Sequence, residues 1–201
     1  MTVLRIDRGV MLGLTIPLDR FPVLIEEHVR RYPDTSRVEN IGRDLVTNGL
    51  MPETVKTFIA EVCGWGGYAG IGGRVLKNNE LKVIATSLQE ALKHLDECPP
   101  KFSLALACVN RLYGLGSPSF ASKHLRFLRP DICPVYDALL REALPYSFDP
   151  DGYDGFAQDC QTIAGYLREA RVRNPVTREG GGWYSADVEA AVFVHVNQWL
   201  A

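Results

Sequence analysis

A Gly-Leu-Gly turn at residues 114–116, followed by a strong helix start, is the part of the chain best suited to bind a phosphate. Ser117 is a good N-cap, and Pro118 at the first helical position removes a donor that would be unpaired anyway. Glycines let the backbone approach a ligand closely, and the first amides of a helix point outward toward an anion. The sequence therefore predicts a phosphate-binding turn at the start of a helix that ends near Arg129.

A second helix is predicted to open at Asp137, after Pro130 and the short connection 131–134. An aspartate at this place is typical of an N-cap, whose carboxylate accepts hydrogen bonds from helix amides. Those amides keep the carboxylate ionised, and its outer oxygen remains available for chemistry. A structural role and a chemical role for Asp137 are therefore compatible.

The order of a hydrophobic-Gly-hydrophobic-Gly turn, a helix and a Pro-Val-x-Asp segment resembles the core of the helix-hairpin-helix DNA glycosylase superfamily. The nearest branch is the 8-oxoguanine glycosylase-like one, and the resemblance covers residues 112–144. It implies that Gly114 and Gly116 form a hairpin that grips a DNA backbone phosphate. It also implies that Asp137 is the catalytic carboxylate, which supports departure of the base.

The chain departs from this family at the position of the lysine. Bifunctional members place a Schiff-base lysine two residues after the second glycine, where this chain has Pro118. Lys123 is the nearest candidate, at the edge of a predicted polar arc formed by Ser119, Ser122, Arg126 and Arg129. The default nucleophile is then water assisted by Asp137. Alternatively, Lys123 forms a Schiff base and strand cleavage follows, or it is an ordinary surface lysine.

Further side chains are candidates for binding DNA or an extruded base. The expected DNA contacts are Gly114, Gly116, Ser117, Ser119, Arg126 and Arg129, although the two arginines fit a solvated face equally well. The glycine-rich stretch 63–79 is either a flexible connector or a loop that holds Trp65 and Tyr68 at a cleft to stack on a base. His124 is a candidate for the base pocket, with hydrogen-bonded packing as the alternative.

Bulk composition limits the possible functions. The 201 residues carry a net charge of -2, which gives no support for strong nonspecific binding to DNA. Five cysteines without a CxxC pattern predict neither a metal site nor a cofactor cluster, and they fit a reducing cytoplasm. No apolar run approaches the length of a membrane span. No cofactor and no membrane partner is expected, and the oligomeric state stays open.

Helical periodicity without comparable strand patterns predicts an all-α fold, formed as one helix-hairpin-helix domain over 1–201 with lobes of roughly 1–100 and 101–201. The first fifteen or so residues are expected to form an extended arm, and a turn-rich loop is expected over 145–156. The predicted function is excision of a damaged or modified purine such as 8-oxoguanine from DNA. Two alternatives remain, a noncatalytic nucleic-acid-binding module and an enzyme acting on a modified guanine outside duplex DNA.

Overall fold

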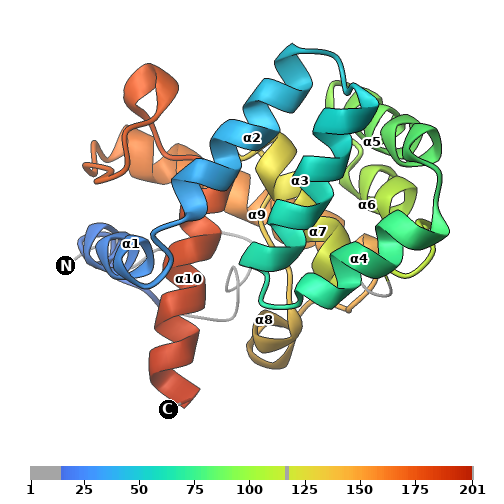
Figure 1. The fold of residues 1–201 in the computed structure, drawn as a ribbon. Coiled ribbons are helices and arrows are strands. Elements are labelled where there is room, and N and C mark those ends of the chain that lie inside the picture. Colours follow the sequence, from blue (N-terminus) through green and yellow to red (C-terminus); the bar gives the residue numbers. More distant parts are fainter. Residues whose placement is uncertain (1–14, 116–117, 201) are drawn as a thin grey trace.

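The structure is a computed structural model that describes residues 15–115 and 118–200 (Figure 1). The all-α prediction is confirmed, because the described residues form ten α-helices and no β-strand. The helices are α1 (Arg20–Arg31), α2 (Thr35–Thr47), α3 (Pro52–Trp65), α4 (Ala69–Asn78), α5 (Leu81–Leu95), α6 (Phe102–Asn110), α7 (Pro118–Leu128), α8 (Ala138–Ala143), α9 (Pro150–Glu169) and α10 (Ser185–Leu200), with a short 3-10 turn at Glu179–Gly181. The predicted N-terminal arm falls almost entirely outside the described residues.

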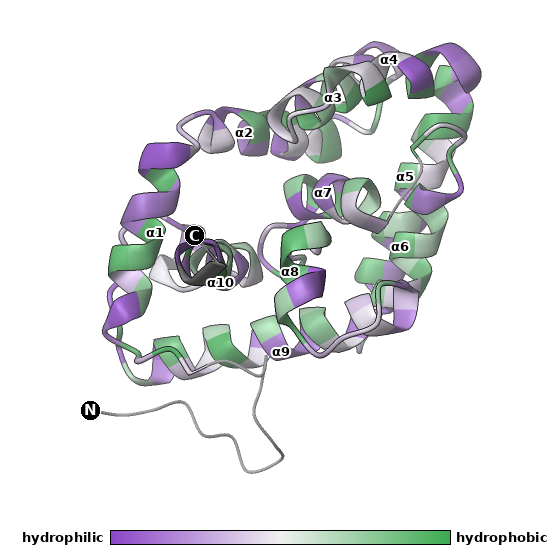
Figure 2. Cartoon of the chain, turned by 90° about the horizontal axis from the view of Figure 1, so that it is seen from below, coloured by the Kyte–Doolittle hydropathy of each residue, from purple (hydrophilic) through white to green (hydrophobic). Residues whose placement is uncertain are grey.

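Helix α7 and most of α10 lie inside a ring of the other helices when the molecule is seen from below (Figure 2), whereas the short α8 lies at the lower edge of the molecule (Figure 1). Helix α7 packs against α2, α3 and α6, while α10 packs against α1, α8 and α9. Every residue of α7 from Phe120 to Leu128 is consequently buried. Two members of the predicted polar arc, Ser122 and Arg126, are therefore covered by neighbouring helices, so the solvated alternative does not hold for them.

The glycine-rich stretch 63–79 is mostly helical, which corrects the prediction of a loop. Helix α3 continues to Trp65, and α4 begins at Ala69 after a turn in which Gly67 has a φ of +82°. A larger residue at position 72 would crowd helix α3, because a Cβ there would lie 3.1 Å from the Cβ of Cys63. The glycines thus let α3 and α4 pack closely.

The segment before α9 also differs from expectation. Helix α9 starts at Pro150, three residues before the expected Tyr153, because Asp149 caps it and accepts a hydrogen bond from the Gly152 amide at 2.8 Å. Helices α6 and α7 pack against each other as the predicted pair does. Two residues of the turn between them, 116 and 117, fall outside the described residues, so the phosphate-gripping hairpin stays a prediction.

Candidate active site

A pocket of about 270 Å³ lies between α1, the α3–α4 turn, α7, the start of α8 and α10. An apolar cavity of about 150 Å³ holds a benzene molecule, so this pocket has room for the two fused rings of a purine. Aromatic and ionisable side chains share its lining, which is typical of ligand sites. The aromatic ones are Tyr32, Trp65, Tyr68, Phe120 and Phe193, and the ionisable ones are His28, Lys123, Asp137 and Glu189.

Lys123 extends from α7 into this pocket, with its side chain 9% exposed. Its Nζ donates a hydrogen bond to Ser119 Oγ at 2.9 Å and lies 4.0 Å from Asp137 Oδ2. Burial lowers the pKa of the Lys123 amine, although the charges of Asp137 and Glu189 partly oppose this shift. A larger fraction of the amine is therefore neutral than in an exposed lysine, and only the neutral amine is nucleophilic.

Asp137 is the N-cap of α8, as predicted, because its Oδ1 accepts a hydrogen bond from the Leu140 amide at 3.2 Å. Its other oxygen, Oδ2, is the one that faces Lys123. One carboxylate oxygen thus fixes the side chain against the helix, and the second lies at the pocket. The structure thus brings Lys123, the candidate named in place of the family's lysine, close to Asp137, although fourteen positions separate them in the chain.

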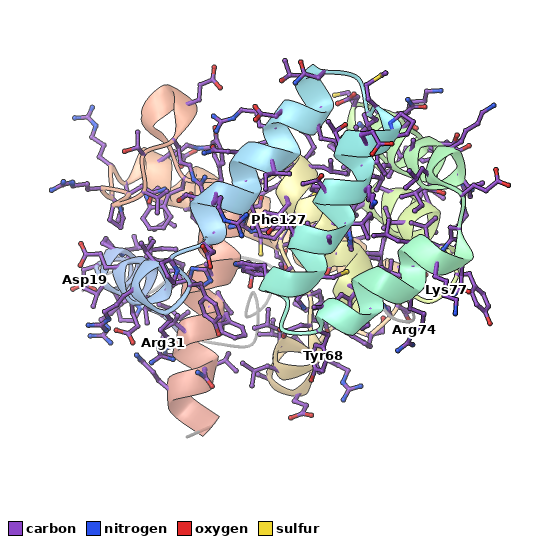
Figure 3. All side chains as sticks on the ribbon, in the orientation of Figure 1. Asp19, Arg31, Tyr68, Arg74, Lys77 and Phe127 are labelled. Carbon is purple, nitrogen blue, oxygen red and sulfur yellow. The ribbon has the colours of Figure 1, made fainter. Side chains whose placement is uncertain are left out.

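Trp65 and Tyr68 flank the α3–α4 turn, and both line the pocket, the placement that the sequence offered as the alternative to a plain connector. The Trp65 Nε1–H donates to Thr35 Oγ1 at 3.0 Å, which fixes the plane of the indole. Tyr68 is 66% exposed at the side of the molecule where α8 lies (Figure 3). Gly66 lets the turn close onto the lysine stem, because a Cβ there would lie 3.1 Å from Lys123 Cδ.

His28 of α1 and Glu189 of α10 also line the pocket, and the sequence analysis did not identify either of them. Burial, followed by the charge of Arg126, lowers the pKa of His28 to about 3, so this imidazole is neutral. Burial raises the pKa of Glu189 to about 8. The available signal for Glu189 was an acidic residue within an otherwise apolar run, which is unusual in a buried helix.

His124 is not part of the pocket, which corrects its prediction as a base-pocket residue. Its side chain has no exposed surface, and its Nδ1 lies 2.6 Å from the Phe120 carbonyl oxygen. The ring packs edge-on against Phe58 of α3. Burial lowers the pKa of His124 to about 4, so the residue is a neutral packing element between α3 and α7.

Arg126 does not reach solvent, and the prediction that it contacts phosphates is wrong. Its side chain is 3% exposed, and its Nη1 lies 2.7 Å from Glu39 Oε1 of α2. This contact is an ion pair without the geometry of a hydrogen bond. Arg129 is also engaged, since its guanidinium contacts Asp131 at 2.9 Å and Asp96 at 2.5 Å. Neither arginine offers an uncompensated charge to a nucleic acid.

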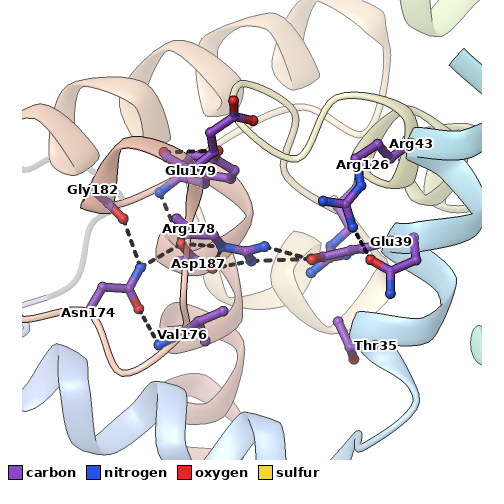
Figure 4. A network of polar contacts seen from close by, with 12 residues as sticks. Thr35, Glu39, Arg43, Arg126, Asn174, Val176, Arg178, Glu179, Gly182 and Asp187 are labelled. Carbon is purple, nitrogen blue, oxygen red and sulfur yellow. Dashed lines mark hydrogen bonds and ion pairs between the residues drawn. The ribbon is translucent and has the colours of Figure 1, made fainter. Parts of the chain in front are cut away.

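Glu39 connects Arg126 to a larger network of buried charges (Figure 4). Arg178 contacts Glu39 at 2.6 Å and Asp187 at 2.5 Å, and Asn174 donates to Asp187 at 2.8 Å. Burial opposes ionisation of Glu39, yet the two arginines outweigh it and lower the pKa of this carboxyl. A cavity of about 400 Å³ lies beside the network, but its buried charges are already paired, so the smaller pocket is the candidate site.

The remaining predicted DNA contacts are only partly described. Gly114 has a φ of +90°, and a Cβ at this position would lie 3.0 Å from the side chain of Arg74, so the position requires glycine. Ser119 lines the pocket and accepts the hydrogen bond from Lys123. Gly116 and Ser117 fall outside the described residues. A phosphate contact at this turn stays a prediction.

Within the described residues, no cluster of His, Cys, Asp and Glu side chains is arranged to hold a metal ion. The five cysteines are free thiols. None of the described helices is both long and apolar enough to cross a membrane. Comparisons with protein-family models, curated proteins and solved structures found no match for this chain.

Proposed function

We propose that the protein is a DNA N-glycosylase of the helix-hairpin-helix type that removes a modified purine such as 8-oxoguanine. The observation that carries the proposal is the pair formed by Lys123 and Asp137, whose Nζ and Oδ2 atoms lie 4.0 Å apart in a purine-sized pocket. An amine and a carboxylate at this distance can serve as nucleophile and charge-stabilising group in the cleavage of a glycosidic bond.

The aromatic lining supports a base as the ligand. Enzymes that act on a nucleotide base take it out of the helical stack and hold it between aromatic or apolar side chains. Trp65, Phe120 and Phe193 offer such faces, and Tyr68 lies exposed nearby. Because Trp65 is held by Thr35, it presents a fixed surface rather than a mobile one.

The environment of Lys123 makes a covalent route the better-supported one. Its neutral amine can attack C1′ of the deoxyribose, and the base departs with the electron pair of the glycosidic bond. Asp137 then stabilises the positive charge that grows on the sugar, while its cap bond keeps the carboxylate in place. The bound amine loses a proton, the C1′–O4′ bond then breaks as O4′ takes up a proton, and the resulting imine between Lys123 and C1′ is reduced by borohydride to a stable amine.

The test uses a labelled duplex that contains one 8-oxoguanine, incubated with the protein and borohydride and run on a denaturing gel. A parallel sample without borohydride is treated with alkali. We expect a covalent band with the wild type and none with Lys123→Met, whereas Lys56→Met, which changes an exposed lysine on α3, keeps it. Asp137→Asn should reduce base release by about 100-fold or more.

Other outcomes separate the routes. Cleavage that alkali reveals without a trapped band would replace Lys123 by water as the nucleophile and leave Asp137 as the main catalytic group. Excision that is unchanged in Asp137→Asn would overturn the catalytic assignment. Absence of both signals would exclude 8-oxoguanine in duplex DNA as the substrate.

A second candidate is an enzyme that uses the same pocket on a modified guanine carried outside duplex DNA. The observation that favours it is the internal pairing of Arg126 and Arg129, together with a net charge of -2. A protein that reads duplex DNA loses affinity steeply as salt rises, because phosphate contacts release counterions. Duplex binding that is weak at low salt and insensitive to added salt would support this candidate.

A further inference from the structure

Glu189 is a buried carboxyl that lines the pocket without a counter-ion. Its residue surface is 5% exposed, and it stands on α10 among apolar neighbours. Within the described part of the chain, no lysine, arginine or histidine nitrogen lies within 4.0 Å of it. A buried acid in such a place is normally neutral, because the charged form loses its hydration without compensation.

The groups around Glu189 do not reverse this preference. On α7, Arg126 is already paired with Glu39, and Lys123 is hydrogen-bonded to Ser119. The other titratable groups that face it are Asp137 before α8, His28 and Tyr32 on α1, and Tyr153 and Cys160 on α9.

Burial and then the carboxylate of Asp137 raise the pKa of Glu189, while Arg126, the Val135 amide and Lys123 act against the shift, and the result is about 8. The acid therefore keeps its proton at neutral pH. The neutral form has a donor and an acceptor side by side, whereas an ionised carboxylate only accepts.

We propose that Glu189 reads the edge of the base in the pocket as a neutral carboxylic acid. Its O–H donates to an acceptor on the base, and its carbonyl oxygen accepts from the N–H next to that acceptor. The ligand class is a base whose edge carries an N–H beside a carbonyl, as in hypoxanthine or at the oxidised edge of 8-oxoguanine. This inference rests on the proposed function, because it takes a base as the ligand.

The donor and acceptor of a neutral Glu189 carboxyl do not match base edges with other hydrogen-bonding patterns. An edge with two adjacent donors, such as N1–H and the exocyclic amine of guanine, pairs with an ionised carboxylate and not with an acid. A base methylated at the edge nitrogen has no N–H to donate. Discrimination by one such polar contact is large when the unpaired group is left buried.

The test measures binding of free hypoxanthine to the full chain by calorimetry between pH 6 and pH 9.5. Glu189→Gln keeps a donor beside an acceptor but cannot ionise, and Glu189→Ala removes both. We expect the glutamine variant to bind within about threefold of the wild type at pH 6.5, and the alanine variant about tenfold or more below it. The affinity ratio of wild type to glutamine variant, which cancels the ionisation of hypoxanthine, should fall about thirtyfold as the pH rises from 6.5 to 9.5.

Controls make the result specific to the edge contact. 1-Methylhypoxanthine should bind the wild type about tenfold more weakly than hypoxanthine does, and the alanine variant should not distinguish the two. Glu142→Gln, at a surface residue of α8, should bind as the wild type does. Far-ultraviolet dichroism establishes that each variant is folded.

The outcomes distinguish this inference from the proposed function. A wild-type to glutamine ratio that is flat with pH, or a glutamine variant as weak as the alanine variant, overturns the reading of Glu189 even if excision is observed. Undetectable binding of hypoxanthine to the wild type at every pH also overturns it. Hypoxanthine affinity that changes as expected in the Glu189 variants, without any excision of a base from DNA, supports the inference about Glu189 and contradicts the proposed glycosylase activity.

Discussion

Two clusters of buried charge meet at α7, and they are built in opposite ways. Arg126 belongs to the first, in which Glu39, Arg178 and Asp187 give every charge an opposite charge within 2.7 Å. Lys123, one turn earlier on the same helix, belongs to the second, in which the nearest carboxylate oxygen lies 4.0 Å away across a pocket. We call the first cluster closed, because each of its charges is paired, and the second open, because its charged groups surround a pocket.

Buried charge is compensated fully in the first cluster and only partly in the second. A buried ion pair needs close geometry and further hydrogen bonds before it offsets the lost hydration, and the first cluster meets that condition. The second leaves Lys123, Asp137 and Glu189 only partly compensated around a cavity. Groups whose pKa is shifted by burial, as those of Lys123 and Glu189 are, gather at functional sites.

The largest effect should come from breaking the closed cluster with Arg178→Met. The change leaves Asp187 without a cation and Glu39 with one arginine instead of two. Removing one partner of a buried pair lowers the free energy of unfolding by about 3–5 kcal/mol, and urea denaturation at pH 7 measures it.

Arg37→Met is the matched control, because it removes an exposed arginine that contacts Glu61 at 2.8 Å. It should lower the free energy of unfolding far less than Arg178→Met does, because solvent screens an exposed ion pair. Equal losses in the two variants would mean that the buried network is no more important to stability than a surface pair.

A second effect concerns the pH dependence of stability at Glu189. Its pKa rises from an ordinary 4.5 to about 8 on folding, so between these values the folded state holds one more proton than the unfolded state. The stabilisation is fully present below pH 4.5 and is lost as the pH rises toward 8. The slope is about 1.4 kcal/mol per pH unit.

Urea denaturation of the wild type and of Glu189→Gln at pH 5, 6, 7 and 8 measures this slope. The variant lacks the titrating group but keeps the others, including His28, so the difference between the two proteins isolates Glu189. We expect the wild type to lose stability relative to the variant at each step. A difference that is constant from pH 5 to pH 8 would show that the carboxyl is already ionised at pH 5.

The order of the helices could be predicted because local signals mark it. Pro118 and the Asp137 cap each fixed a helix start that the structure confirms. The glycine-rich stretch misled for a physical reason, because glycines that disfavour an isolated helix also permit the close contact of α3 with α4. In this stretch, the packing of α3 against α4 outweighs the low intrinsic helix propensity of glycine.

The candidate site could be predicted only in part. Of the candidates, Asp137, Lys123, Trp65 and Tyr68 line one pocket, although the sequence left a surface position for Lys123 and a plain connector at residues 63–79 equally open, and Arg126 and His124 lie in other packing contacts. Helical periodicity identifies a polar face without telling whether another helix covers it. In this molecule, α2 and α3 pack against α7 and cover its polar residues. Such tertiary contacts cannot be deduced from the helical periodicity of a single sequence.

The smallest effect on stability should come from opening the pocket cluster further with Lys123→Met. The amine is desolvated in the folded state, so its pKa is lowered, and the unfolded state binds more protons at alkaline pH. The charge therefore opposes folding below its folded pKa, and an apolar side chain of similar length relieves that penalty. Loss of the bond to Ser119 acts in the opposite direction, since that hydroxyl then depends on water from the pocket. We expect the free energy of unfolding at pH 7 to stay within about 1 kcal/mol of the wild type, whereas the trapped covalent band disappears. A loss as large as that of Arg178→Met would instead make Lys123 part of the closed architecture, and the contrast between the two clusters would not hold.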